Sequence, residues 1–175
     1  MKIALVPFGQ VEQKFLDYLK EELGKTFGKE CIQLAPLPIP TQAFNPVRRQ
    51  YLSDLFLREL GKIKAEGVEK ILGITEVDLY TQGLNFVFGQ ASLGGREAVI
   101  SLARLHQSFY GLPEDERIFL ERTLKEAIHE LGHTWGLTHC PDPLCVMHFS
   151  NSLRDTDIKK AEFCPRCLSA LKAHL

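Results

Sequence analysis

Apolar and polar residues along the chain form two kinds of pattern: short continuous apolar runs, and longer segments with apolar residues at helical spacing. The continuous runs, beginning with KIALVPFG, predict buried strands, and segments such as VEQKFLDYLKEELGKTFG predict amphipathic helices. Strands are predicted at 2–9, 31–37 and 69–79, and helices at 11–28 and 47–67. The first part of the chain therefore alternates between strands and helices, which is typical of a layered α/β arrangement.

The middle of the chain predicts a β-hairpin. LNFVFGQAS at 84–92 and EAVISLARL at 97–105 have strand character, and the LGGR between them supplies the glycines of a tight turn. The second segment is apolar on both faces, as a central strand is, whereas the first becomes polar at its end. We therefore expect 84–92 to form an edge of the sheet.

A long helix is predicted at 113–136, with acidic residues in its first turn. Regular structure fades after this helix, and the remaining residues are rich in cysteine. The expected fold class is α/β, in the broader sense α+β. We expect a single domain of residues 1–175, with a sheet-bearing N-terminal subdomain at 1–136 and an irregular C-terminal subdomain at 137–175.

Composition narrows the range of partners. The 175 residues are 45% hydrophobic, which suits one domain, and the net charge of -1 gives no electrostatic case for nucleic acid or an anionic membrane. No apolar run reaches the roughly 18 residues of a membrane span, and the start of the chain does not resemble a secretory signal. We therefore expect a cytoplasmic protein in a reducing compartment.

The predicted long helix carries HELGH near its carboxyl end. His129 and His133 lie one helical turn apart, about 5–6 Å at Cβ, so both side chains can reach one zinc ion. Glu130 lies about 100° around the helix axis from His129, where it can reach a water molecule on the metal without binding the metal itself. HExxH is the pattern of this arrangement, although two histidines on a helix can also serve packing or solvation.

Gly136 and His139 extend the pattern beyond the helix. A helix continued to His139 would point this side chain about 120° away from His133, out of reach of a shared metal. Because glycine adopts the left-handed conformation that ends a helix, Gly136 can turn the chain and bring His139 back as a third ligand. Three protein ligands leave one tetrahedral position open, as catalytic zinc requires. The expected chemistry is amide hydrolysis by a zinc-activated water, with Glu130 as general base.

Four of the five cysteines form two closely spaced pairs after the long helix, Cys140 with Cys145 and Cys164 with Cys167. In a reducing compartment this layout indicates a structural zinc held by four thiolates, which brings the expected zinc content to two ions per chain. Two disulfides, or a zinc ribbon that contacts nucleic acid, are the alternatives. The fifth cysteine, Cys31, lies in a predicted strand, and we expect it to be an inert buried thiol.

HELGHTWGLTH matches the HExxHxxGxxH signature of the metzincin clan of zinc peptidases, and the four cysteines that follow it resemble those of the archaemetzincin family. The resemblance continues through NPVRRQY, GLNFVFGQA, TLKEAIHELGHTWGL and FSNSLRDTD, and therefore covers most of the chain. It implies a metzincin-like fold: a mixed twisted sheet with an antiparallel edge strand, backing helices, an active-site helix and a zinc-clipped C-terminal subdomain. It also implies peptidase activity on a peptide or protein substrate.

The resemblance implies roles for further residues. Met147 matches the methionine of the Met-turn, which lies beneath the zinc ligands in this clan. The edge strand would pair with the substrate backbone near Phe86 and Phe88, the only substrate contacts that we suspect. Some members of the clan carry a tyrosine at the position of Phe149, whose phenyl ring cannot donate a hydrogen bond to an oxyanion. We expect the neighbouring His148 to be packed or solvated rather than to take over that role.

Two other classes of function compete with a zinc peptidase. A zinc-organised peptide-binding protein with weak or lost catalysis would share the edge strand and both metal sites, but it would have no need of a base such as Glu130. A metal-clipped scaffold or nucleic-acid adaptor would need only the cysteine site, and the neutral net charge disfavours it.

Overall fold

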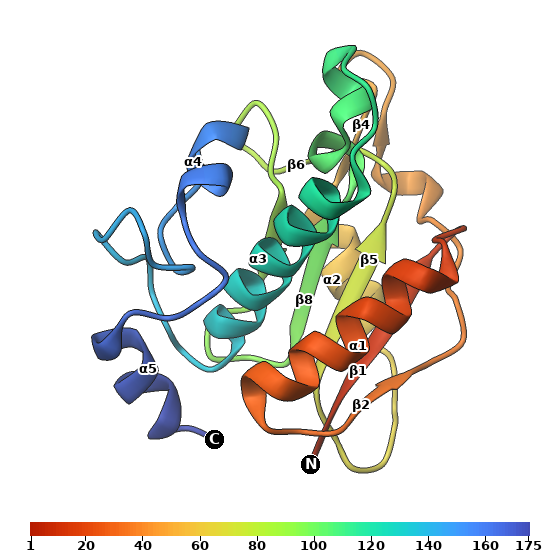
Figure 1. The fold of residues 1–175 in the computed structure, drawn as a ribbon. Coiled ribbons are helices and arrows are strands. Elements are labelled where there is room, and N and C mark those ends of the chain that lie inside the picture. Colours follow the sequence, from red (N-terminus) through yellow and green to blue (C-terminus); the bar gives the residue numbers. More distant parts are fainter.

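Four parallel strands and one antiparallel edge strand form the main sheet of the computed structural model, which describes residues 1–175 (Figure 1). The order across the sheet is β2-β1-β5-β8-β7, and only the β7–β8 pair is antiparallel. The strands are β1 (Lys2–Phe8), β2 (Cys31–Gln33), β5 (Val68–Thr75), β7 (Gly89–Ala91) and β8 (Glu97–Ser101). The prediction of a mixed sheet with an antiparallel edge strand is therefore confirmed.

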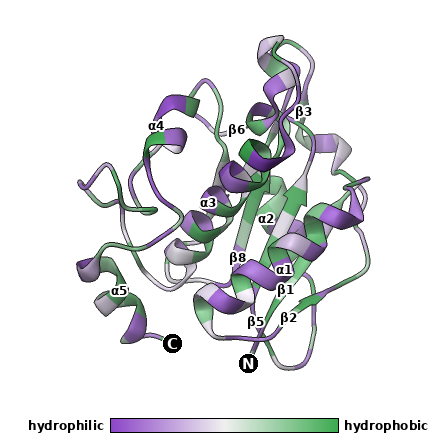
Figure 2. Ribbon diagram, viewed as in Figure 1, coloured by the Kyte–Doolittle hydropathy of each residue, from purple (hydrophilic) through white to green (hydrophobic).

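Helices cover both faces of this sheet. Helices α1 (Gln13–Phe27) and α3 (Glu116–Thr134) pack on one face, in front of the strands in Figure 1, and α2 (Ser53–Gly61) packs on the other. Because side chains alternate along a strand, Ile3 and Leu5 of β1 belong to the larger core under α1 and α3, whereas Ala4, Val6 and Phe8 belong to the core on the α2 side. Apolar residues line the strands and the inner sides of these helices (Figure 2).

A second, three-stranded sheet and several short helical turns were not expected from the sequence. The small sheet has the order β3-β4-β6. These elements are η1 (Thr41–Ala43), β3 (Phe44–Asn45), β4 (Gln50–Leu52), β6 (Leu79–Tyr80), η2 (Ala103–Leu105) and η3 (Gln107–Tyr110).

The helix predicted at 47–67 is shorter than expected, because the chain first forms a turn and strand β4. The Asn45 side chain accepts hydrogen bonds from the backbone N–H groups of Val47 and Arg48, and Arg49 has a φ of 55°. This Asx-type turn diverts the chain from helical geometry until Ser53.

Four predicted strands are also shorter than expected. Strand β5 ends at Thr75 instead of residue 79, and β8 ends at Ser101 instead of residue 105. Strand β2 ends at Gln33, although Leu34 and Leu37 still donate backbone hydrogen bonds to β1, because Pro36 lacks the N–H that a continuous ladder needs. In the predicted hairpin, the segment 84–88 is irregular, and only Gly89–Ala91 pairs with β8.

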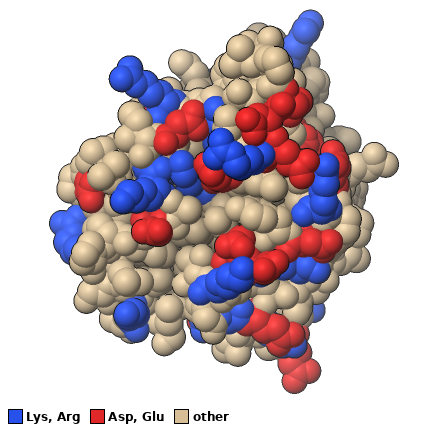
Figure 3. All heavy atoms as spheres, viewed as in Figure 1, with Lys and Arg blue, Asp and Glu red and all other residues tan.

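The chain after α3 is largely irregular, as predicted, and contains only α4 (Leu153–Ile158) and α5 (Pro165–Lys172). In Figure 1, α4 lies to the left of α3, and α5 lies below the carboxyl end of α3. None of the helices combines the length and the apolar character that crossing a membrane requires. Basic and acidic side chains are interspersed on the face shown in Figure 3.

Candidate metal centres and active site

Helix α3 holds the HExxH residues on a buried surface. Its first turn is fixed by Asp115, whose carboxylate accepts a hydrogen bond of 3.2 Å from the Ile118 backbone N–H. At the other end of the helix His129 and Glu130 are buried, with 3% and 6% of their surface exposed. The metal-ligand candidates therefore lie on a rigid element rather than on a loop.

The carboxyl end of α3 turns as the sequence predicted. Gly136 has a φ of 87°, its N–H donates to the His133 carbonyl oxygen at 2.9 Å, and the Leu137 N–H donates to the Gly132 carbonyl oxygen at 3.1 Å. This pair of bonds is a Schellman motif, in which a left-handed glycine reverses the chain. The reversal brings His139 back beside the helix, where its ring centroid lies 5.3 Å from that of His129 and 4.9 Å from that of His133.

The three imidazoles fit a metal ion. The ring nitrogens that His129, His133 and His139 could offer as ligands all lie within 4.8 Å of one another. Nδ1 of His129 lies 2.8 Å from the Val146 carbonyl oxygen, and Nδ1 of His133 lies 2.7 Å from the Leu137 carbonyl oxygen. Because a carbonyl oxygen only accepts hydrogen bonds, both Nδ1 atoms carry the proton, which leaves each Nε2 with a free lone pair.

These two Nε2 atoms face each other at 3.1 Å. With no proton between them the lone pairs repel, unless a cation lies between the rings. Two nitrogen ligands of tetrahedral zinc are separated by about 3.3 Å, given Zn–N bonds of about 2.0–2.1 Å. Burial also lowers the pKa of all three histidines, which keeps the rings in the neutral form that binds metals.

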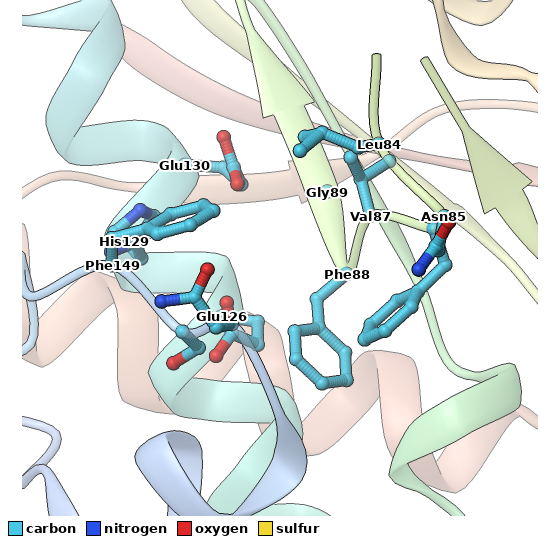
Figure 4. A pocket seen from close by; sticks show the side chains of 12 residues that line it. Leu84, Asn85, Val87, Phe88, Gly89, Glu126, His129, Glu130 and Phe149 are labelled. Atoms are coloured by element: carbon cyan, nitrogen blue, oxygen red, sulfur yellow. The ribbon is translucent and has the colours of Figure 1, made fainter. Parts of the chain in front are cut away.

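Glu130 lies between the histidines and the edge strand. Burial, reinforced by the nearby carboxylate of Glu126, raises the pKa of Glu130 well above its ordinary range. A Cβ atom placed on Gly89 of β7 would lie 2.8 Å from Cγ of Glu130, so only glycine allows this close approach of strand and helix. The carboxyl group lines the same cavity as His129 and Gly89 (Figure 4).

The hydrogen-bond register of the hairpin leaves part of β7 unpaired. Ser101 N–H donates to the Phe88 carbonyl oxygen at 2.8 Å, and Ser92 N–H donates to the Glu97 carbonyl oxygen at 2.9 Å. In an antiparallel pair, alternate residues face the partner strand, so the backbone groups of the intervening Gly89 and Ala91 face the open edge. An extended chain could therefore pair with β7 directly beside Glu130.

Met147 lies fully buried beneath the histidine cluster. A Cβ atom on Gly132 of α3 would lie only 2.5 Å from Sδ of Met147, so glycine at this helical position is what allows the methionine to approach. The Met147 carbonyl oxygen also accepts a hydrogen bond of 3.0 Å from the Cys140 N–H. The histidine cluster and the cysteine cluster are thus connected through one residue.

The four C-terminal cysteines form a second compact cluster. The Sγ atoms of Cys140, Cys145, Cys164 and Cys167 lie within 4.8 Å of one another, and all four residues are free thiols rather than disulfides. The Sγ atoms of Cys140 and Cys164 are 3.8 Å apart, close to the roughly 3.8 Å between two sulfur ligands of tetrahedral zinc with Zn–S bonds of about 2.3 Å.

Backbone N–H groups point at the sulfur atoms of this cluster. The Cys164 N–H donates to Sγ of Cys145 at 3.3 Å, and the Cys167 N–H donates to Sγ of Cys164 at 3.4 Å. The latter hydrogen bond lowers the pKa of Cys164 to about 7. Such bonds stabilise thiolates, the form in which cysteine binds a metal. Cys31 lies elsewhere; it is half-buried rather than buried, and burial raises the pKa of its thiol to about 11.

The remaining predicted residues surround the histidine cluster in different ways. Phe86 and Phe88 precede β7 instead of lying in it, and their rings meet edge to face at 5.0 Å. The Phe149 ring lies 4.9 Å from that of His139. Nδ1 of His148 lies 2.8 Å from the Cys140 carbonyl oxygen.

Sequence reasoning missed four residues that shape the site: Gly89, Glu126, Ser150 and Lys159. Of these, only Glu126 could have been found from the sequence, because it lies one helical turn before Glu130 and hence on the same side of α3. The other three come from segments far from the helix in sequence, and no local pattern indicates their placement.

Comparison with known proteins gives consistent matches over nearly the whole chain. The sequence model of peptidase family M54 matches residues 25–173. The archaemetzincin of Methanocaldococcus jannaschii is 46% identical over 98% of this chain and 93% of its own length, and that of Pyrococcus horikoshii is 51% identical over 91% of this chain and 88% of its own. The crystal structure of the archaemetzincin from Methanopyrus kandleri superposes with a TM-score of 0.90 at 44% identity, covering 99% of this chain and 94% of the other.

Proposed function

Because the chain belongs to peptidase family M54, the family of the archaemetzincins, and is a zinc-dependent peptidase, we propose that its histidine cluster holds the catalytic zinc. In this proposal His129, His133 and His139 are the ligands, and peptides or proteins are the substrates. The observation that carries the proposal is the pair of Nε2 lone pairs facing each other at 3.1 Å beside a buried glutamate.

Glu130 is the general base of the proposed reaction. When bound, zinc supplies Lewis acidity, which polarises the substrate carbonyl and makes a water molecule more acidic. Glu130 removes a proton from the attacking water and later delivers it to the leaving amine. Burial raises the pKa of Glu130, which favours the protonated carboxyl group that delivers the proton to the leaving amine.

The backbone of β7 orients the substrate in this proposal. The outward-facing groups of Gly89 and Ala91 would form main-chain hydrogen bonds with an extended peptide, as in β-strand addition. These bonds recognise no particular side chain, and they would place the scissile bond within reach of Glu130.

A second zinc, bound by Cys140, Cys145, Cys164 and Cys167, is part of the same proposal, for a total of two zinc ions per chain. Four thiolates close the coordination sphere, so this ion stabilises structure and performs no chemistry. On this basis we divide the single domain into a sheet-bearing subdomain at 1–136 and a zinc-clipped subdomain at 137–175. Because the cysteines must stay reduced to bind metal, we also propose a cytoplasmic location.

Replacement of one histidine tests the proposed ligands. His133→Ala should bind one zinc ion instead of two, cleave no peptide and keep its far-ultraviolet circular dichroism spectrum. His174→Ala, which changes an exposed histidine near the end of the chain, is the matched control and should keep both zinc ions. Two zinc ions in His133→Ala would refute the assignment of the catalytic site.

A further inference from the structure

A cavity of about 170 Å³ opens beside Glu130, between α3 and the segment that precedes β7. Figure 4 shows Glu126, His129 and Glu130 on one side of it, with Phe88 and Gly89 on the other. Its lining includes Phe88, Gly89, Glu126, His129, Glu130 and Ser150. Because a proposed metal ligand and the proposed base are among these residues, a side chain in this cavity would belong to a substrate residue next to the scissile bond.

Glu126 gives the cavity a polar wall that the proposed reaction does not use. Its side chain is almost fully buried, with 2% of the residue exposed. Oε1 accepts a hydrogen bond of 2.9 Å from the Thr156 hydroxyl and lies 3.2 Å from Nζ of Lys159. Both contacts fall on this one oxygen, and Oε2 has no hydrogen-bond partner within the protein, so it remains available as an acceptor.

Lys159 compensates the charge of Glu126. No part of its side chain is exposed, and its ammonium group also donates to the His148 carbonyl oxygen at 3.2 Å. An additional cation from a substrate would therefore meet a carboxylate that is already paired. A neutral hydrogen-bond donor can use the free oxygen of Glu126 without disturbing the ion pair.

Ser150 supplies a second unused polar group. The residue is only 9% exposed and lines the cavity, and its hydroxyl oxygen has no hydrogen-bond partner. Buried hydroxyl groups are usually paired, and an unpaired one costs about 1–3 kcal/mol in general. Two residues that line one cavity thus offer a free acceptor oxygen and an unpaired hydroxyl group, which together are complementary to a side-chain amide or hydroxyl.

We propose that this cavity is a specificity pocket for a neutral, hydrogen-bond-donating substrate side chain, with Glu126 and Ser150 as its specificity-determining residues. The inference rests on the proposed function of the neighbouring site. In this proposal the substrate strand runs antiparallel to β7, with its carboxyl-terminal half beside Phe88, so the pocket receives the residue that follows the scissile bond. Ser, Thr, Asn and Gln are neutral side chains that can donate a hydrogen bond to Glu126 in this cavity.

Matched variants can convert the pocket to an apolar one. A change of Glu126 or Lys159 alone leaves a buried charge without a partner, whereas replacing both members of a buried ion pair with apolar residues of similar size is often neutral for stability. The double variant Glu126→Leu with Lys159→Met therefore removes the polar wall and keeps the volume. Ser150→Ala removes the hydroxyl group alone.

Binding of two peptide hydroxamates to the protein loaded with both zinc ions tests the proposal without turnover. They carry Asn or its near-isostere Leu at the position after the metal-binding group. Wild type should bind the Asn compound at least about tenfold more tightly, Ser150→Ala should reduce this ratio, and the double variant should reverse it.

If wild type binds the Asn and Leu compounds equally tightly, or binds the Leu compound more tightly, the inference is overturned and the proposed function stays intact. Binding of neither compound, although both zinc ions are present, would mean that the pocket does not receive substrate and would equally overturn the inference. A protein that takes up zinc only at its cysteines would refute the proposed function itself, and the inference with it.

Discussion

Gly89 and Glu130 touch so closely that a Cβ atom on the glycine would lie 2.8 Å from Cγ and 3.0 Å from Oε1 of the glutamate. The edge strand thus supports the carboxyl group that we propose as general base. Because the same glycine has outward-facing backbone groups and lies against Glu130, one contact aligns the proposed substrate-binding strand with the proposed base.

Gly89→Ala should therefore lower kcat/KM by about tenfold to a hundredfold, since a displacement of about 1 Å can cost a factor of this size. Zinc content should stay the same, because the histidines do not touch this glycine. Steady-state cleavage and metal analysis provide the measurement. Gly61→Ala is the control, because its added Cβ would meet only ordinary contacts at 3.7 Å. A fully active Gly89→Ala would show that the contact does not position the base.

Gly132→Ala should destabilise the protein by about 1–3 kcal/mol, the usual cost of an extra methyl group in a packed core. The new Cβ would approach Sδ of Met147 at 2.5 Å, so the methionine must move away from beneath the histidines. Denaturant unfolding of the zinc-loaded protein measures the change. Combining Gly132→Ala with Met147→Ala should recover part of the loss, and full additivity of the two changes would argue against their contact.

Cys164→Ala should bind one zinc ion fewer and unfold at a lower temperature, because structural zinc binding contributes directly to folding free energy. Thermal unfolding and metal content are the two measurements. Cys31→Ala, outside the cluster, should keep both zinc ions. An unchanged melting temperature in Cys164→Ala would contradict a structural role for the cluster.

Lys159→Met should lower the free energy of unfolding by about 3–5 kcal/mol, because it leaves the Glu126 carboxylate buried without its partner. The double variant Glu126→Leu with Lys159→Met should lose markedly less free energy of unfolding than Lys159→Met alone. Urea unfolding curves for both proteins give the comparison. Equal losses would show that the two side chains are not coupled.

A pH-dependent contribution to stability is expected from His106. Hydrogen bonding to the Glu76 carboxylate, at 2.9 Å, raises the pKa of His106 above its ordinary value. The interaction is fully present below the unfolded-state pKa of about 6.5 and is lost as pH rises through the higher folded-state pKa. Stability differences between wild type and His106→Gln should therefore shrink from about pH 6 upwards. The contribution of this pair to the free energy of unfolding should be below about 1 kcal/mol, because His106 and Glu76 are both partly exposed. A constant difference across this range would exclude the ion pair as its source.

The parts of the fold that could be predicted from sequence are those that depend on local patterns. Strand β1, helix α1 and helix α3 follow from the spacing of their apolar residues, and the left-handed turn at Gly136 follows from glycine's conformational freedom. The same locality explains why the three histidines were recognised together, since one helical turn and one chain reversal bring them into proximity.

The parts that could not be predicted depend on contacts between distant segments. The small sheet joins β4 with β6 across helix α2, and the turn before β4 depends on the side chain of Asn45 rather than on apolar spacing. The Glu126–Lys159 pair links α3 with the residue that follows α4, and the Gly89–Glu130 contact links an edge strand with a helix. Such pairings become visible only once the chain is folded.

The most direct test of the central claim is cleavage of a diverse peptide mixture by wild type and by Glu130→Gln at equal zinc content, with products identified by mass spectrometry. We expect new peptide termini with wild type and none with Glu130→Gln, because the variant binds zinc but cannot accept the proton. Equal cleavage by both proteins would contradict the assignment of Glu130 as the general base.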